Sequence, residues 1–159
     1  MMSVRNSTIG ITFLYALTLI VVTFGVQSAA NAKPAINTLG TPGLAIKGYD
    51  PVAYFEERRP RKGLVQFTLK HKGVEWRFSS AVNRARFQAN PAKYEPAYGG
   101  YCAYGVSRGY LVKIEPDAWS IVNGRLYLNY NRQVRATWNK QPEVYIQRAN
   151  ANFSNLINK

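Results

Sequence analysis

The chain has 159 residues, a formal net charge of +13 at pH 7, and only one cysteine and one histidine. A single cysteine excludes an internal disulfide, and a chain of this length suits one domain with a packed core. The positive charge is compatible with attraction to anionic surfaces such as phospholipid head groups or acidic envelope polymers, but the interpretation we favour is a soluble surface that happens to be basic.

Residues 1–32 form a predicted export signal. Arg5 precedes an apolar stretch at 9–26, and small residues ending in Ala-Asn-Ala at 30–32 follow. This order is typical of a cleaved signal peptide, and the lack of an Arg-Arg pair favours the general secretory pathway over the twin-arginine route. An uncleaved membrane anchor is the alternative. We therefore expect a periplasmic or secreted protein with no stable membrane span after signal removal. We expect no nucleic-acid partner, because the positive charges are scattered and an exported protein rarely meets nucleic acid.

After the signal, residues 33–42 form a predicted linker and residues 43–157 a single predicted domain. Inspection of the sequence finds no internal repeat and no second domain. At the start of this domain, Asp50 is expected to cap a short helix that opens with Pro51 and runs to about Glu57, because proline at the first helical position costs no hydrogen bond.

A β-hairpin is predicted next. Apolar and polar residues alternate over 65–69 and again over 74–78, on either side of a Lys-Gly pair. Alternation of this kind indicates strands with one buried face. Ser79 or Ser80 then caps a predicted helix, which the Asn-Pro pair at 90–91 ends or bends.

The stretch 94–109 is predicted to be a long glycine-bearing loop, after which 110–112 resumes an extended pattern. The clearest local signal follows. Alternating strands over 119–122 and 125–130 flank an Asn-Gly pair, which is typical of a tight type I′ hairpin.

Two helices are predicted to close the chain. Asn131 caps the first of them and Pro142 opens the last. Together, these elements predict an α+β fold in which antiparallel β-hairpins pack against helices.

Several motifs occur in an order that resembles a known family. They are Gly-Tyr-Asp-Pro-Val-Ala-Tyr-Phe at 48–55, Trp-Arg-Phe-Ser-Ser at 76–80, Phe87, Asn-Pro-Ala-Lys-Tyr at 90–94, and Gly-Gly-Tyr-Cys-Ala-Tyr-Gly-Val-Ser at 99–107. Together they resemble the exported YHS-domain proteins, over residues 43–156. The resemblance implies a small α+β domain and says little about activity, because the exported members are mostly uncharacterised.

Other YHS domains, attached to metal-transporting ATPases and mercury-handling proteins, resemble metal-binding modules that present three cysteines. The matching positions here are Ala53, Ser79 and Asn83, and none of them replaces a thiolate as a ligand for a soft metal. The sequence therefore favours a role without a cofactor. The alternative is a copper or zinc site built on Cys102 and His71, to which carboxylates would have to be added for zinc.

Cys102 has two interpretations. A redox or nucleophilic thiol would need a lowered pKa, supplied by a helix N-terminus or a neighbouring cation. Free cysteine is also among the residues most often buried as a small apolar filler, which is the interpretation we favour. Because no nucleophile-elbow pattern or other catalytic arrangement is present, we do not expect an enzyme.

Tyrosines surround this cysteine in the sequence, and phenol rings combine apolar walls with a hydrogen-bonding tip. They either line a pocket or form part of the core. We expect a non-enzymatic module that binds a small molecule or an envelope protein. The predicted binding residues are Tyr49, Tyr98, Tyr101, Cys102, Tyr104, Tyr110 and Trp119.

Overall fold

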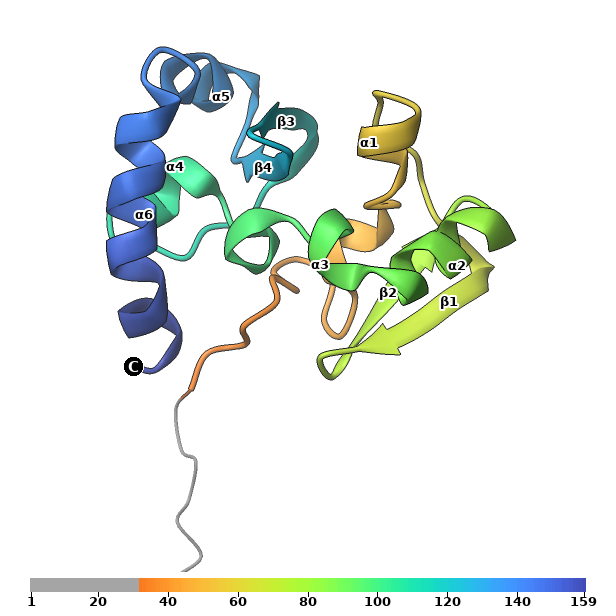
Figure 1. Ribbon diagram of the computed structural model, residues 1–159. Coiled ribbons are helices and arrows are strands. Elements are labelled where there is room, and N and C mark those ends of the chain that lie inside the picture. Colours follow the sequence, from red (N-terminus) through yellow and green to blue (C-terminus); the bar gives the residue numbers. More distant parts are fainter. Residues whose placement is uncertain (1–31) are drawn as a thin grey trace, which may run out of the picture.

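The computed structural model describes residues 32–159, so the predicted export signal lies outside the described residues apart from Ala32. Short helices and two β-hairpins follow one another along the chain (Figure 1). In order, the elements are η1 (Ala45–Gly48), α1 (Ala53–Glu56), β1 (Leu64–His71), β2 (Val74–Phe78), α2 (Ala81–Ala89), α3 (Pro91–Tyr94), η2 (Ala97–Gly100), α4 (Ala103–Ser107), β3 (Glu115–Val122), β4 (Arg125–Asn129), α5 (Arg132–Trp138) and α6 (Pro142–Ile157). Within the described part of the chain, no helix combines the length and apolar character that crossing a membrane requires.

The predicted α+β class is confirmed, because two antiparallel hairpins pack against helices. In the first hairpin Leu69 pairs with Trp76, and in the second Ile121 pairs with Leu126. The expected turns connect the strands, and Asn123 has the positive φ of 49° that a type I′ turn requires. Each hairpin also has an irregular register near the start of its first strand.

The predicted helix caps are also present. The Ser80 hydroxyl accepts a hydrogen bond from the Asn83 N–H at 3.1 Å at the start of α2, and Asn131 Oδ1 accepts one from the Val134 N–H at 2.8 Å at the start of α5. These bonds satisfy backbone donors that the first turn of a helix leaves free. As expected, Pro142 is the first residue of α6.

The two halves of the chain repeat the same order of elements, which inspection of the sequence did not detect. Residues 44–96, the first unit, and residues 97–157, the second unit, each contain a 3-10 turn, a short helix, a hairpin, a capped helix and a helix opened by proline. Equivalent core rings pack alike, because the ring centroids of Trp76 and Phe87 and those of Tyr127 and Trp138 are both 5.0 Å apart at 33°. Each residue of the second pair follows its counterpart by 51 positions.

The two units share one core rather than standing apart. The Tyr54 phenol in α1 donates a hydrogen bond to the Pro116 carbonyl in β3 at 3.1 Å, and its ring packs edge-on against Trp119 with centroids 5.5 Å apart. Buried residues of both units belong to the same apolar cluster, among them Ile46 and Trp76 from the first and Leu128 from the second. Residues 44–157 therefore form two similar units whose buried side chains meet in one apolar cluster.

The stretch 94–109 differs from the loop that we predicted. It contains the 3-10 turn η2 and the helix α4, and Cys102 caps that helix by accepting a hydrogen bond from the Gly105 N–H at 3.3 Å. Because glycine lowers helix propensity, Gly105 made this stretch look like a loop in the sequence, and the helix was not predicted.

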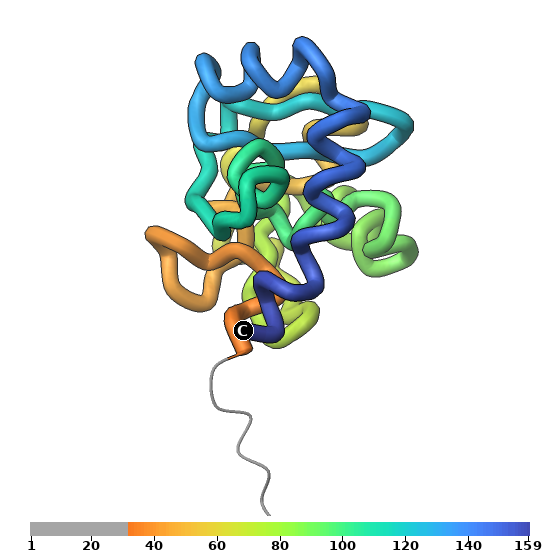
Figure 2. The backbone as a smooth tube through the Cα atoms, turned by 90° about the vertical axis from the view of Figure 1, so that its left-hand side faces the viewer, coloured from red at the N-terminus to blue at the C-terminus, as the bar shows by residue number. Residues whose placement is uncertain are grey.

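The segment 33–42, predicted as a linker, packs against the second unit as an arm. The Asn37 side chain donates to the Gly100 carbonyl at 2.9 Å, the Tyr101 phenol donates to the Pro34 carbonyl at 2.9 Å, and the Lys33 N–H donates to the Ile157 carbonyl at 2.9 Å. Figure 2 shows this arm beside the C-terminal end of α6.

Candidate functional site

The most polar buried position is Asp50, which is fully buried at the start of the turn before α1. One carboxylate oxygen accepts hydrogen bonds from the Val52 and Ala53 N–H groups at 2.8 and 3.3 Å. The other accepts from the Ser79 N–H at 2.8 Å, the Ser79 hydroxyl at 2.7 Å and the Asn83 side-chain amide at 2.7 Å. We call this group of five residues the Asp50 centre.

The Asp50 centre ties three elements together, because its donors come from α1, from the end of β2 and from α2. A buried carboxylate is tolerated only when hydrogen bonds replace its lost hydration, and five donors do so here. Ala53, Ser79 and Asn83 are also the positions that the family resemblance matched to cysteines. Since they offer a methyl group, a hydroxyl and an amide, this centre holds a carboxylate and has no thiolate for a soft metal.

Cys102 occupies the equivalent place in the second unit and is 1% exposed. Its sulfur lies 3.8 Å from Asn129 Oδ1, and the same oxygen accepts a hydrogen bond from the Tyr104 N–H at 3.2 Å. Burial raises the pKa of the Cys102 thiol, although hydrogen bonds from backbone N–H groups such as that of Gly105 lower it in part. A raised pKa and a lack of exposure both oppose the thiolate that redox or nucleophilic chemistry needs.

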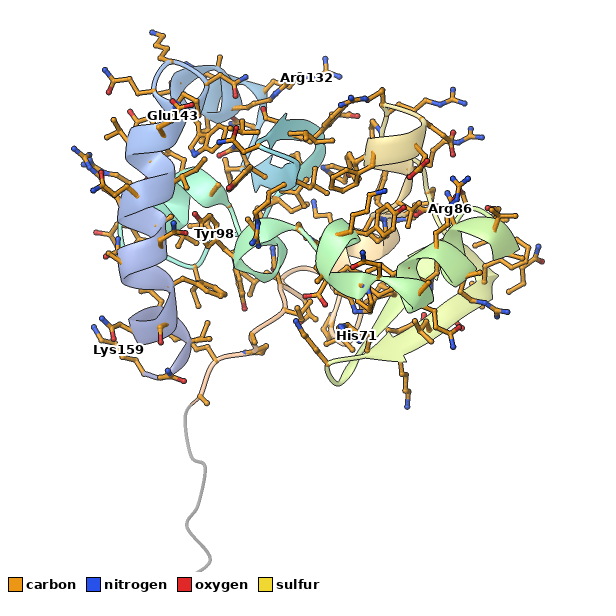
Figure 3. The ribbon with its side chains drawn as sticks, in the orientation of Figure 1. His71, Arg86, Tyr98, Arg132, Glu143 and Lys159 are labelled. Carbon is orange, nitrogen blue, oxygen red and sulfur yellow. The ribbon has the colours of Figure 1, made fainter. Side chains whose placement is uncertain are left out.

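His71 lies at the end of β1, where Figure 3 shows it near the tip of the first hairpin. Its Nε2 is 2.6 Å from Glu95 Oε1, and Lys72 Nζ is 2.5 Å from the other oxygen of the same carboxylate. His71 and Cys102 thus have separate partners and share no hydrogen bond. Among residues 32–159, no three His, Cys, Asp or Glu side chains are grouped so that they could hold a metal ion.

The predicted binding tyrosines are spread over several places. Tyr98 is 8% exposed and Tyr101 is 2% exposed, whereas Tyr110 is 67% exposed. Tyr101 and Tyr110 line a groove of about 370 Å³ between the arm and the end of α6. The Tyr104 ring instead packs edge-on against Tyr145 of α6, with centroids 5.1 Å apart.

The two predicted residues outside this stretch face cations. The Lys62 ammonium lies 4.8 Å from the centre of the Tyr49 ring, and the Arg135 guanidinium lies 5.9 Å from that of Trp119. The faces of these two rings are thus in contact with cations of the protein itself rather than turned toward a shared pocket. The structure therefore does not bring the predicted set together in one pocket.

The larger cavity lies where the two units and the arm meet, and we call it the junction cavity. Its volume is about 590 Å³. It is lined by Ala35, Ile36, Lys72, Ala92, Glu95, Pro96, Ala97, Tyr98, Gly99, Arg125, Tyr127, Asn150, Phe153 and Ser154. Of the predicted binding residues, only Tyr98 contributes.

Aromatic rings form one wall of the junction cavity. The Tyr98 ring centroid lies 6.0 Å from that of Tyr127 and 5.6 Å from that of Phe153. Tyr98 extends from η2 toward α6 (Figure 3), where its hydroxyl is 3.0 Å from Asn150 Oδ1 and 3.2 Å from the Ile146 carbonyl oxygen. These bonds fix the ring against α6 within the second unit.

Arg125 lines the same cavity and acts electrostatically on these rings. Burial raises the pKa of Tyr98, the neighbouring Tyr127 phenol raises it further, and the Arg125 guanidinium opposes the shift. Burial also raises the pKa of Tyr127, again opposed by Arg125. Arg125 is exposed and forms no ion pair within residues 32–159, whereas Lys72 on the opposite hairpin is bound to Glu95. The cavity thus combines aromatic walls with one available guanidinium.

Sequence reasoning missed Tyr127, Phe153 and Arg125 as cavity residues. Tyr127 alternates with buried leucines in a strand and Phe153 falls on the apolar side of a helix, so both are typical of core residues. Only the repeat of elements could have indicated a junction between two units. Comparisons with protein-family models, curated proteins and solved structures found no match for this chain.

Proposed function

We propose that this chain is an exported, non-enzymatic binding module of the YHS type that takes a small organic anion into the junction cavity. The observation that carries this proposal is the cavity itself, with Tyr98, Tyr127 and Phe153 on its wall and Arg125 beside them. The motif order that resembles exported YHS-domain proteins supports the family and the export.

Size and lining support a small ligand. Sites for small molecules commonly have volumes of about 300–1,000 Å³, with mostly apolar walls and a few polar groups that set orientation. The junction cavity, at about 590 Å³, falls within this range. Tyr98, Tyr127 and Phe153 belong to an apolar cluster within the second unit, and Ile36 belongs to the cluster that both units share. Packed apolar clusters rather than one flexible loop therefore hold its walls.

Charge supports an anion. An arginine guanidinium presents several N–H donors in a plane, which suits carboxylate, sulfonate or phosphate oxygens. Arg125 has no acidic partner among residues 32–159, and the net charge of +13 attracts anions from a distance. A ligand with an aromatic or apolar body could stack on the rings while its anionic group meets Arg125.

The alternative, a metal-handling or thiol-redox protein that uses Cys102, has less support. The sulfur is 1% exposed and its pKa is raised by burial. His71, the other ligand of that alternative, is held by Glu95.

Binding of 1-anilinonaphthalene-8-sulfonate, an aromatic sulfonate whose fluorescence rises in apolar sites, tests the proposal. Ala92 and Ala89 are both exposed alanines, but only Ala92 lines the cavity. Ala92→Trp should therefore weaken binding by about tenfold or more by filling the cavity, whereas the matched Ala89→Trp should stay within about twofold.

Arg125→Gln tests the anion-binding role in the same titration. Loss of a charge-assisted hydrogen bond should weaken binding by about tenfold. Arg148→Gln removes the same charge from α6 outside the cavity lining and should have little effect. Equal effects of the two members of each pair would contradict the proposed site.

A further inference from the structure

Positive charge is concentrated in one part of the first unit. Residues 58–94 contain ten lysines and arginines but only one acidic residue, Glu75. Glu75 is itself 2.7 Å from Arg77, so it does not neutralise the other cations of this stretch. Six of these ten cations form ion pairs with Glu56, Glu57, Glu75 or Glu95. The other four form none within the described residues 32–159: Arg58, Lys62, Lys70 and Arg84.

Exposed apolar side chains lie in the same part of the molecule. Val65 is 70% exposed, Val82 is 60% exposed and Leu64 is 46% exposed. The register between β1 and β2 is irregular from Leu64 to Thr68, so Val65 sits in a part of β1 that has no regular strand partner. Exposed apolar residues that gather in one part of a surface, with polar groups around them, mark sites where a membrane or another protein binds.

The structure brings these residues to one end of the protein. Leu64 pairs with Phe78, the last residue of β2, and α2, which carries Val82 and Arg84, begins shortly afterwards. The loop with Arg58 leads directly into β1. In Figure 1 the start of β1 and α2 lie at the right-hand end, and this loop runs down to them from the top of α1; Figure 3 places Arg86 of α2 at the same end. We call Arg58, Arg84, Leu64, Val65 and Val82 the basic end.

We propose that the basic end docks on the surface of a bilayer that contains anionic phospholipids. Cations near such a surface are attracted to the head groups, and apolar side chains beside them can enter the region between head groups and acyl chains. The basic end offers both kinds of group on one end of the domain. This inference is independent of the junction cavity, because neither Arg58, Arg84 nor the three apolar residues line it.

A bilayer fits better than a soluble polyanion such as a nucleic acid. A polyanion would neutralise Arg58 and Arg84 but would leave Leu64, Val65 and Val82 in water. Binding of single-stranded nucleic acid also relies on exposed aromatic rings that stack on bases. The exposed large apolar residues of the basic end are aliphatic rather than aromatic.

Co-sedimentation with lipid vesicles tests this proposal, using the protein as it is purified from cells. Vesicles of phosphatidylcholine alone are compared with vesicles in which phosphatidylglycerol replaces part of it. We expect binding to the anionic vesicles only, and weaker binding as salt is added. Binding of equal strength to both vesicle types would overturn the proposal.

Two double variants separate the charged and apolar contributions. Arg58→Gln with Arg84→Gln should weaken binding to the anionic vesicles by about 30-fold, since each cation near the surface contributes about fivefold. The control, Lys140→Gln with Arg148→Gln, removes the same charge from the second unit and should change binding by less than about threefold, through the net charge alone. Equal losses in both would overturn the assignment to the basic end.

Val65→Ser with Val82→Ser should weaken binding by about tenfold, because the aliphatic groups no longer leave water. Val144→Ser, at a 37% exposed valine of α6, is the matched control and should bind like the unchanged protein. Heparin supplies the polyanion outcome. If the protein bound heparin as tightly as vesicles and the valine variant had no effect on either, a polyanion would replace the bilayer as the partner.

Discussion

The two units have the same backbone arrangement at the turn before their short helix, but they place different side chains there. Asp50 and Cys102 each begin the turn before a short helix, and each backbone N–H donates to the segment that leads into the next strand, at 2.8 Å to Arg61 and 3.1 Å to Val112. Each side chain also accepts a hydrogen bond from the N–H three residues ahead at 3.3 Å. One is a carboxylate and the other a thiol.

The neighbours of these two residues explain the difference. Ser79 and Asn83 supply donors to the Asp50 carboxylate, whereas Tyr130 and Val134 stand 51 positions later in the second unit. The side-chain amide nearest to Cys102 is that of Asn129, which presents its oxygen, an acceptor, to the sulfur at 3.8 Å. A buried charge there would therefore have no side-chain donor such as Ser79 and Asn83 provide, and a neutral thiol avoids that cost. This buried turn position thus tolerates a charged side chain only in the unit where the surrounding elements supply hydrogen-bond donors.

Removing Asp50 tests this comparison most severely. Asp50→Ala leaves three N–H groups, a hydroxyl and an amide without their acceptor, so we expect the free energy of unfolding to fall by about 4 kcal/mol or more. Urea unfolding followed by circular dichroism measures the loss.

The control for this variant is Asp117→Ala. Asp117 is an exposed aspartate whose carboxylate is 3.6 Å from Arg132, and its loss should cost less than about 1 kcal/mol. Similar costs for the two aspartates would show that the Asp50 centre does not hold the first unit together.

A second difference between the units lies in the 3-10 turns. Lys47 and Gly99 occupy equivalent left-handed positions, with φ of 54° and 60°. At Gly99, however, an added Cβ would lie 1.8 Å from the Ala35 carbonyl oxygen of the arm. Gly99→Ala should therefore displace the arm and lower the free energy of unfolding by about 2–3 kcal/mol, with faster thermolysin cleavage before Ile36, which is 3% exposed in the packed arm.

Lys47→Ala is the matched substitution in the first unit. It keeps a side chain at the same φ and removes only the ion pair of Lys47 with Glu115, whose carboxylate is 2.9 Å away. The expected cost is less than about 1 kcal/mol. If Gly99→Ala were equally mild and the arm stayed protected, packing of the arm would not explain the glycine.

Local signals made much of the fold predictable. The Asn-Gly turn at 123–124, the caps Ser80 and Asn131, and Pro142 each act through the chain within a few residues of themselves. Their physical cause is therefore visible in a short stretch of sequence. The same holds for Asp50 as a cap, but not for its bonds to Ser79 and Asn83, which are brought close by the first hairpin.

The repeat and the junction cavity depend on contacts that no short stretch contains. The paired core rings are Trp76 with Phe87 in one unit and Tyr127 with Trp138 in the other, so no residue of either pair is identical to its counterpart. The cavity joins residues of the arm, α3, η2, β4 and α6. Its lining residues 95–99 lie in the stretch 94–109 that the sequence marked, but only Tyr98 was among the predicted binding residues. The sequence marked that stretch because it is rich in tyrosine. Tyrosines suit pockets and cores equally well, so composition could not distinguish the two.

The thiol of Cys102 tests the comparison from the second unit, and its removal should lower the free energy of unfolding by the smallest amount. Because the sulfur is buried and its pKa is raised, Ellman's reagent should modify it only when the protein opens, at a rate that rises with urea. A cysteine at exposed Ala89, introduced into a Cys102→Ala background, is the control and should react at the rate of a free thiol.

Cys102→Ala itself should lower the free energy of unfolding by about 1–2 kcal/mol, less than Asp50→Ala, because it removes a small neutral group with weak hydrogen bonds. Reaction of Cys102 as fast as the control would instead assign it to an accessible, reactive site and would favour the thiol-redox alternative.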